Sequence, residues 1–288
     1  MIARFAVQNP SVSVTTSSAP EADAEVISFF YPVPGLGFVP INAFLLRAQE
    51  PVLVDTGPIV ARELYLDALE QLIDLDDLRW IYLTHADPDH VGCLMDVLAA
   101  APKARLVTTF IGLGRLGLYQ PISPDRVYLL NPGQRVSVGD RELQAVAPLT
   151  FDAPETTPFV DSKTRALFSS DGFGGIISGP ADSAAEMSAD ALRDAVITWT
   201  TIDTPWLRDV ESTAFEANRA KIRELASPIV LSSHLPPAVG MLDRLLEHVA
   251  AARRAPPFVG PDQAALAAML ASLAARPAAE TAGAPASH

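Results

Sequence analysis

The segment from Thr84 to Gly92 constrains this chain more than any other. It reads Thr-His-Ala-Asp-Pro-Asp-His-Val-Gly and follows the apolar run Trp80–Leu83, which is typical of a buried strand. Carboxylates clustered at the end of a buried strand repel one another unless a cation lies between them. We therefore predict a metal-binding loop, with a solvated acidic turn as the alternative. The candidate ligands in this loop are His85, Asp87, Asp89 and His90.

The composition allows a large core and disfavours several classes of partner. Of the 288 residues, 49% are hydrophobic and 19% are charged, so the chain can bury a sizeable core. The formal net charge of −13 disfavours nucleic acid and anionic membranes as partners. The N-terminus does not resemble a secretory signal, and the single cysteine, Cys93, fits a reducing compartment. These features predict a soluble cytoplasmic protein that binds neither nucleic acid nor membrane.

The apolar pattern predicts one domain over residues 25–275. We expect residues 1–24 to be irregular apart from a short edge strand, and residues 276–288 to be a disordered tail. Turn residues at 131–133 and 139–140 indicate that strands at 126–130, 135–138 and 142–147 form successive hairpins. Hairpins followed by alternating helices and strands occur twice along the chain. This order indicates two mixed sheets packed together with helices outside.

Two further polar residues follow apolar runs in the same way as the first motif. Asp171 comes after Leu167–Ser170, and His234 comes after Ile229–Ser233. Each of these residues alone is equally typical of a turn or a helix cap. Because the same placement occurs three times, we expect one shared site at the rim of the sheets.

With these residues in this order, the chain resembles the metallo-β-lactamase superfamily over nearly all of residues 25–255. Val52–Gly57 is similar to the first motif, in which the aspartate shapes the metal loop. The segment His85–His90 is similar to the second motif, Asp171 to the bridging fourth motif and His234 to the fifth. The resemblance implies an α/β (α+β) fold of the four-layer αββα sandwich type, with a dinuclear metal site between the two sheets.

Two departures from the superfamily pattern narrow the resemblance. Asp87 stands where a histidine is usual, and no histidine of the third motif lies between His90 and His234. The flavodiiron and oxygen-binding di-iron proteins carry a glutamate at the first of these positions, and their fourth motif is similar to Leu167–Gly174. Counting back from that match without a gap puts Asp152 at the third-motif position. The alternative, that Asp152 only begins a turn, stays open.

The resemblance implies two metal ions that share Asp171 as a bridge. Metal 1 would also bind His85, Asp87 and Asp152, and metal 2 would also bind Asp89, His90 and His234. Carboxylates and imidazoles without a thiolate favour iron, with manganese or zinc as alternatives. Aspartate is shorter than glutamate, so Asp87 must approach metal 1 more closely than a glutamate would. A further alternative is therefore that only the metal 2 position is filled. Cys93 is interpreted as a small buried hydrophobic residue and not as a ligand.

Three functions are compatible with this site, and we favour an enzyme. The first is a di-iron oxidoreductase that binds or reduces a small oxidant such as dioxygen or nitric oxide, with an external electron donor. The second is a hydrolase, in which Asp89 positions or deprotonates a bridging hydroxide that attacks an ester, lactone or thioester. The third is a non-catalytic sensor or binding domain. Family members often dimerise, so the resemblance also implies a homodimer.

Overall fold

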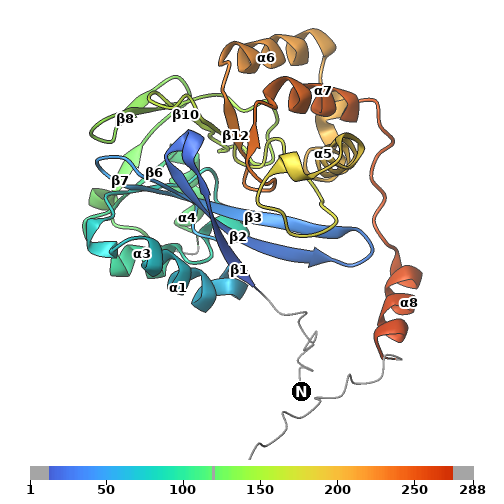
Figure 1. Ribbon diagram of the computed structural model, residues 1–288, viewed down its shortest axis with the longest axis horizontal. Coiled ribbons are helices and arrows are strands. Elements are labelled where there is room, and N and C mark those ends of the chain that lie inside the picture. Colours follow the sequence, from blue (N-terminus) through green and yellow to red (C-terminus); the bar gives the residue numbers. More distant parts are fainter. Residues whose placement is uncertain (1–12, 119–120, 275–288) are drawn as a thin grey trace, which may run out of the picture. The chain divides into compact units, whose positions relative to one another are not determined.

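The computed structural model describes residues 13–118 and 121–274 (Figure 1). The chain divides into two compact units, Met1–Pro256 and Pro257–His288. In the second unit, the described secondary structure is the helix α8 (Gln263–Ala274). The expected tail, 276–288, lies outside the described residues, as do the first twelve residues of the expected irregular segment. The extent of the domain, residues 25–275, therefore stays a prediction.

The first unit is built on two β-sheets. A seven-stranded sheet has the strand order β1-β2-β3-β4-β5-β6-β7, and a six-stranded sheet has the order β13-β12-β11-β10-β9-β8. The strands of the first sheet are β1 (Val14–Ala19), β2 (Ala24–Val33), β3 (Gly37–Leu46), β4 (Val52–Val54), β5 (Trp80–Tyr82), β6 (Arg105–Thr108) and β7 (Val127–Leu129). Those of the second are β8 (Arg135–Ser137), β9 (Glu142–Ala145), β10 (Phe159–Asp161), β11 (Leu167–Phe168), β12 (Ile229–Leu231) and β13 (Ala238–Val239).

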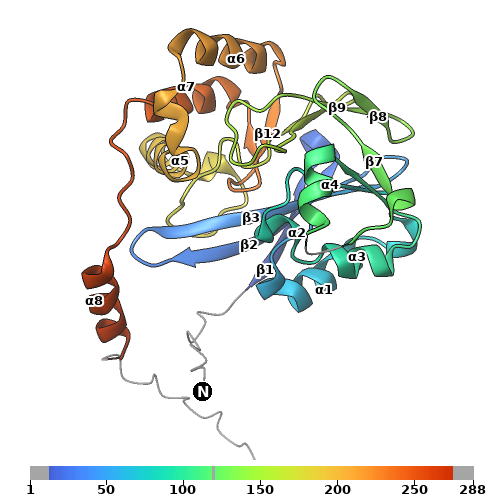
Figure 2. The ribbon, with the colours of Figure 1, turned by 180° about the vertical axis from the view of Figure 1, so that it is seen from behind.

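Helices cover the outer face of each sheet, which confirms the predicted αββα sandwich (Figures 1 and 2). The helices beside the first sheet are α1 (Arg62–Leu72), α2 (Pro88–Val91), α3 (Leu94–Ala100) and α4 (Phe110–Leu116). Those beside the second are α5 (Ala189–Asp203), α6 (Ser212–Glu224) and α7 (Leu242–Ala252). No helix in the described ranges is both long enough and apolar enough to cross a membrane.

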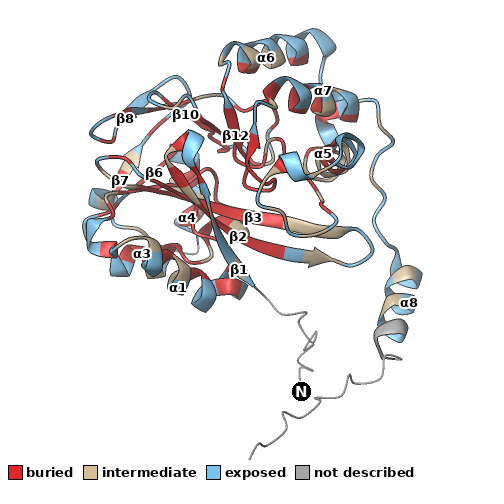
Figure 3. Cartoon of the chain, viewed as in Figure 1, coloured by how far each residue is buried: buried red, intermediate tan, exposed pale blue. Residues whose placement is uncertain are grey.

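The core lies in three layers between these elements, and the strands are largely buried (Figure 3). Between the sheets, Phe44, Phe159 and Phe168 pack as a row of aromatic rings, with Phe159 and Phe168 stacked at 4.4 Å between centroids. Each such buried side chain contributes about 1.5–3 kcal/mol relative to an exposed one. Two further layers join each sheet to its helices. This packing holds the two sheets in fixed positions on either side of the residues between them.

The direction of the strands explains why the metal motifs meet. Strands β4, β5, β6 and β7 are parallel, so the loops that follow β4 and β5 leave from the same edge of the first sheet. In the second sheet β11 and β12 are also parallel, and the loops after them carry Asp171 and His234. The carboxyl ends of parallel strands lie at one edge of a sheet. The predicted shared site at the rim follows from this arrangement.

The sequence prediction was wrong about one strand. β7 does not form a hairpin with β8, because it pairs in parallel with β6 at the edge of the first sheet. Residues 131–133 carry the chain from one sheet to the other: Pro132 has no N–H to continue a ladder, and Gly133, at a φ of 90°, donates its N–H to the Ala145 carbonyl. The predicted hairpin between β8 and β9 is confirmed.

Candidate metal centre

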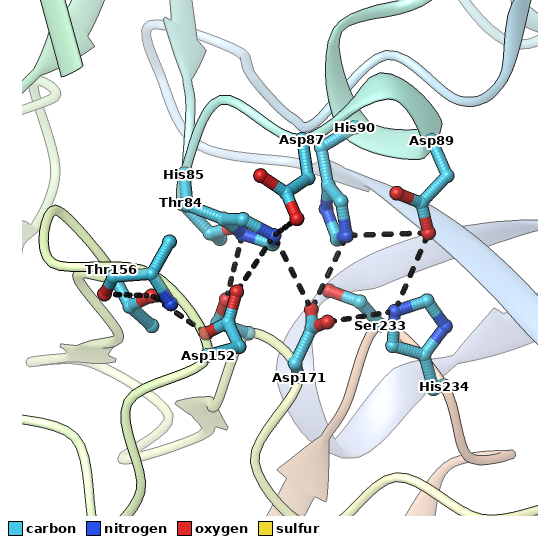
Figure 4. A network of polar contacts seen from close by, with 12 residues as sticks. Thr84, His85, Asp87, Asp89, His90, Asp152, Thr156, Asp171, Ser233 and His234 are labelled. Carbon is cyan, nitrogen blue, oxygen red and sulfur yellow. Dashed lines mark hydrogen bonds and ion pairs between the residues drawn. The ribbon is translucent and has the colours of Figure 1, made fainter. Parts of the chain in front are cut away.

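The structure brings all seven predicted ligands together (Figure 4). Four of them lie on the loop after β5 and on the short helix α2, one on the loop before β10, and one each after β11 and β12. Three overlapping groups have potential ligand atoms within 4.8 Å of one another: His85, His90 and Asp171; Asp89, His90 and His234; and His85, Asp87 and Asp152. The two sheets thus each contribute part of one cluster.

Asp152 is the predicted ligand that the sequence supported least. Among the nearby carboxylates, that of Asp152 lies closest to His85. Its Oδ2 is 3.0 Å from His85 Nε2, and its Oδ1 accepts a hydrogen bond from the Thr156 hydroxyl at 2.6 Å. His85 Nε2 is also 3.9 Å from Asp171 Oδ1 and 4.0 Å from Asp87 Oδ2. The carboxylates of Asp87, Asp152 and Asp171 therefore all lie within 4.0 Å of His85 Nε2.

Asp171 lies between the two predicted metal positions. Its Oδ2 is 3.1 Å from His234 Nε2, and its Oδ1 is 3.2 Å from His90 Nε2. Asp89 Oδ2 closes the second group, at 3.5 Å from His234 Nε2 and 3.6 Å from His90 Nε2. Asp171 Oδ1 also lies 3.9 Å from His85 Nε2, so the Asp171 carboxylate contacts ligands of both predicted groups, as a bridging residue requires.

Several buried atoms in the cluster make no hydrogen bond with the described residues. They are His85 Nε2, His90 Nε2, Asp152 Oδ2 and Asp171 Oδ1. A buried polar atom without a hydrogen bond costs about 1–3 kcal/mol. Four of them pointing into one cluster fit bound cations, because metal ions accept lone pairs from imidazole nitrogens and carboxylate oxygens.

Hydrogen bonds outside the cluster orient the imidazole rings toward its centre. His90 Nδ1 lies 2.9 Å from Asp55 Oδ2, and His234 Nδ1 lies 2.8 Å from the Pro40 carbonyl oxygen. A ring that donates through Nδ1 has its lone pair on Nε2, the atom that faces the cluster. Asp55, with a φ of 58°, also accepts hydrogen bonds from the Thr84 backbone N–H and hydroxyl. Its place beside the ligands agrees with the loop-shaping role that the resemblance implied.

Charge in the cluster shifts the pKa values of its members. Burial alone would lower the pKa of His234, but the Asp171 and Asp89 carboxylates raise it to about 9. Burial also acts to lower the pKa of His90, but nearby carboxylates outweigh this effect and raise the pKa. Burial would raise the pKa of Asp171, yet the surrounding histidines hold it well below its usual range. Without a metal, His90 and His234 therefore carry protons that neutralise nearby carboxylates.

Four residues near the cluster carry no recognisable signal in the sequence. Arg115 on α4 contacts Asp87 Oδ1 at 3.0 Å and the buried Glu155 at 2.5 Å. On α5, Trp199 packs against His234, and Asp203 lies one turn later. Burial and the Asp171 and Asp152 carboxylates raise the pKa of Asp203 to about 8. These contacts depend on how α4 and α5 pack, which no local pattern reveals.

The chain matches one protein-family model and a group of curated proteins. The model, described as ODP family beta lactamase, matches residues 39–234. Diflavin flavoprotein A 1 of Synechocystis sp. strain PCC 6803 is 32% identical over 136 residues, which is 46% of this chain and 23% of that protein. A type A flavoprotein of Rhodobacter capsulatus is also 32% identical over 136 residues, 46% of this chain and 31% of that protein. The matched part thus spans about a quarter to a third of these relatives.

Solved structures with the same fold cover more of the chain. A variant of the flavo di-iron protein from Thermotoga maritima superposes with a TM-score of 0.72 at 18% identity, covering 84% of this chain and 63% of that one. The rubredoxin oxygen:oxidoreductase from Desulfovibrio gigas superposes with a TM-score of 0.71 at 16% identity, covering 84% and 62%. These superpositions establish the fold of this chain over the part that they cover.

Proposed function

Because the chain belongs to the ODP beta-lactamase family, we propose that it holds two iron ions and uses them to bind or reduce dioxygen or nitric oxide. The observation that carries this proposal is the position of Asp171. Its carboxylate lies 3.1 Å from His234 and 3.2 Å from His90, both proposed for metal 2, and 3.9 Å from His85, proposed for metal 1. In this proposal metal 1 takes His85, Asp87 and Asp152, metal 2 takes Asp89, His90 and His234, and Asp171 bridges them.

The donor set supports iron over the alternatives. The site offers carboxylate oxygens and imidazole nitrogens, and the buried Cys93 thiol lies outside the ligand groups, against the Pro58 carbonyl. Hard oxygen donors with imidazoles suit iron and manganese, whereas structural zinc sites are usually richer in thiolate or imidazole. Four carboxylates also match the charge of two divalent ions. The donor set thus disfavours zinc, and we favour iron over manganese because structural neighbours are named flavo di-iron proteins.

Exposure of the ligands indicates where a small molecule would enter. The side chains of Asp87 and Asp89 are 41% and 32% exposed, whereas those of Asp152 and Asp171 are 7% and 8% exposed. Bound ferrous ions would supply electrons to the oxidant. The chain would hold the ions from the buried side and leave the side of Asp87 and Asp89 open for the oxidant.

An external electron donor and a homodimer complete the proposal. One structural neighbour is named a rubredoxin oxygen:oxidoreductase. By analogy with that neighbour, we propose that a small redox protein reduces the iron of this chain between turnovers. Size-exclusion chromatography with light scattering tests the dimer, and a chain-sized mass would contradict it.

Reaction of reconstituted protein with an oxidant tests the function. We expect protein loaded anaerobically with ferrous iron to change its optical spectrum and consume oxygen when mixed with dioxygen. The variant His85→Ala should lose this reaction, and His248→Ala on α7 should keep it. No spectral change and no oxygen uptake by the iron-loaded protein would overturn the proposal.

Two results would instead assign the other functions. Turnover of lactones or thioesters by manganese- or zinc-loaded protein, lost in His85→Ala, would indicate a hydrolase in which Asp89 handles the attacking hydroxide. Protein that takes up no metal under any loading condition would indicate a non-catalytic binding domain.

A further inference from the structure

Trp199 on α5 contacts two of the proposed ligands, although it lies in neither ligand motif. The centroid of its indole ring is 4.4 Å from that of His234, and the two ring planes are inclined by 37°. Its Nε1 donates a hydrogen bond to the Asp171 carbonyl oxygen at 3.1 Å. One side chain from the outer helix layer thus touches the bridging residue and a ligand of metal 2.

The loop after Asp171 leaves room for this indole only because residue 174 is glycine. A Cβ built on Gly174 would lie 2.4 Å from Trp199 Nε1 and 2.7 Å from its Cδ1, distances that real Cβ atoms do not show. The Gly174 N–H also donates to the Asp171 carbonyl, at 3.0 Å. The indole and the loop therefore fit each other closely around the same carbonyl oxygen.

Different contacts outside the ligand set hold the three histidine rings. His90 is held by Asp55, and His85 Nδ1 lies within 3.2 Å of the Thr84 and Ser170 hydroxyls. His234 makes one hydrogen bond outside the cluster, to the Pro40 carbonyl. A single hydrogen bond leaves an imidazole free to tilt about that bond. The face of Trp199 limits that tilt, and so keeps Nε2 directed at Asp171 and Asp89.

We propose that Trp199 is a positioning residue for metal 2, which it serves by fixing the ring of His234 and the backbone of Asp171. Residues that orient metal ligands change metal affinity by about 10–100-fold when they are altered. The indole binds no metal itself in this proposal. The inference rests on the proposed metal function, and its test separates the two.

Two substitutions disturb this contact in different ways. Trp199→Phe keeps an aromatic face against His234 and removes the N–H donor, whereas Gly174→Ala keeps the indole and displaces it. Trp206→Phe, at a 43% exposed tryptophan, is the matched control. Each full-length protein is titrated with Co²⁺, whose visible spectrum reports the geometry of each site, and circular dichroism checks folding.

We expect Gly174→Ala to weaken binding of one Co²⁺ ion by about 10–100-fold and to shift its spectrum. Trp199→Phe should weaken binding of the same ion by a smaller factor. Trp206→Phe should bind Co²⁺ with the affinity and spectrum of the unaltered protein. If both variants fold and bind both ions with unaltered affinity and spectra, Trp199 has no positioning role. If Trp199→Phe does not fold, Gly174→Ala alone decides. If the unaltered protein binds no Co²⁺, the proposed function fails and this inference fails with it.

Discussion

Two buried clusters of charge in this molecule differ in how their carboxylates are balanced. In one, the fully buried guanidinium of Arg141 pairs with Asp161 at 3.2 Å, Asp140 at 2.9 Å and Asp23 at 3.1 Å. Lys163 adds a second cation beside Asp23 and Asp140. In the metal centre, the guanidinium of Arg115 contacts only Asp87 among the four carboxylates, and imidazoles face the others.

The unpaired atoms show what this difference means. None of the buried side-chain atoms found without a hydrogen bond in the described residues belongs to the Arg141 cluster, whereas four belong to the metal centre. Arg141 joins residues of both sheets and the turns beside them, so that cluster is a complete structural connection. In the metal centre, four buried ligand atoms have no hydrogen-bond partner among the described residues. The side chains of the polypeptide thus balance the charge of the first cluster, and we propose that metal ions balance the charge of the second.

The largest effect is expected from removing the bridge of the metal centre. Asp171→Ala removes a carboxylate from both ligand groups and should abolish binding of both ions, as measured by elemental mass spectrometry after loading with iron. The Arg141 cluster should be unaffected, so the variant should still fold. Retention of two ions by Asp171→Ala would show that Asp171 is not the bridge.

Breaking the Arg141 cluster should instead cost stability. Arg141→Met leaves Asp161 buried beside no guanidinium, and loss of one partner from a buried ion pair typically costs about 3–5 kcal/mol. Urea unfolding of metal-free protein measures this loss. Folded Arg141→Met should bind metal as the unaltered protein does. A loss below about 1 kcal/mol would mean that this cluster is not the structural connection described above.

Metal binding should release protons from the histidines of the metal centre. Because carboxylates raise the pKa of His234 to about 9 and that of His90 above its usual range, metal binding must displace their protons near neutral pH. Apparent affinity should therefore rise with pH, by about tenfold per unit for each proton displaced. Titrations with Mn²⁺ between about pH 6 and 8 measure this slope. A pH-independent affinity would contradict the protonated state of the metal-free centre.

The smallest effect is expected at Asp203. The pKa of Asp203 is raised from its ordinary value of 3.8 to about 8 in the folded metal-free protein. Between these two pH values the folded protein keeps the Asp203 proton, whereas the unfolded chain has released it. Stability from this group is thus lost as the pH rises from about 4 to 8. Asp203→Asn should be more stable than the unaltered metal-free protein at pH 8 and nearly equal to it in stability at pH 4. An equal difference at both values would contradict the shift.

The sequence predicted most of the fold and every proposed ligand, for physical reasons. The ligands follow apolar runs at the carboxyl ends of parallel strands, so strand periodicity was enough to place them at one edge. Asp152 follows no such run, and only its distance from Asp171 along the chain indicated it. Arg115 and Trp199 reach the centre from α4 and α5, and helix packing over long sequence separations decides such contacts. β7 was misassigned because a turn sequence does not reveal which sheet receives the next strand.

Mössbauer spectroscopy of anaerobically iron-loaded protein, before and after exposure to dioxygen, tests the central claim most directly. We expect two ferrous ions per chain that become ferric together and couple magnetically through the shared Asp171 carboxylate. Iron that is absent, that occupies a single uncoupled position, or that stays ferrous in dioxygen would contradict it.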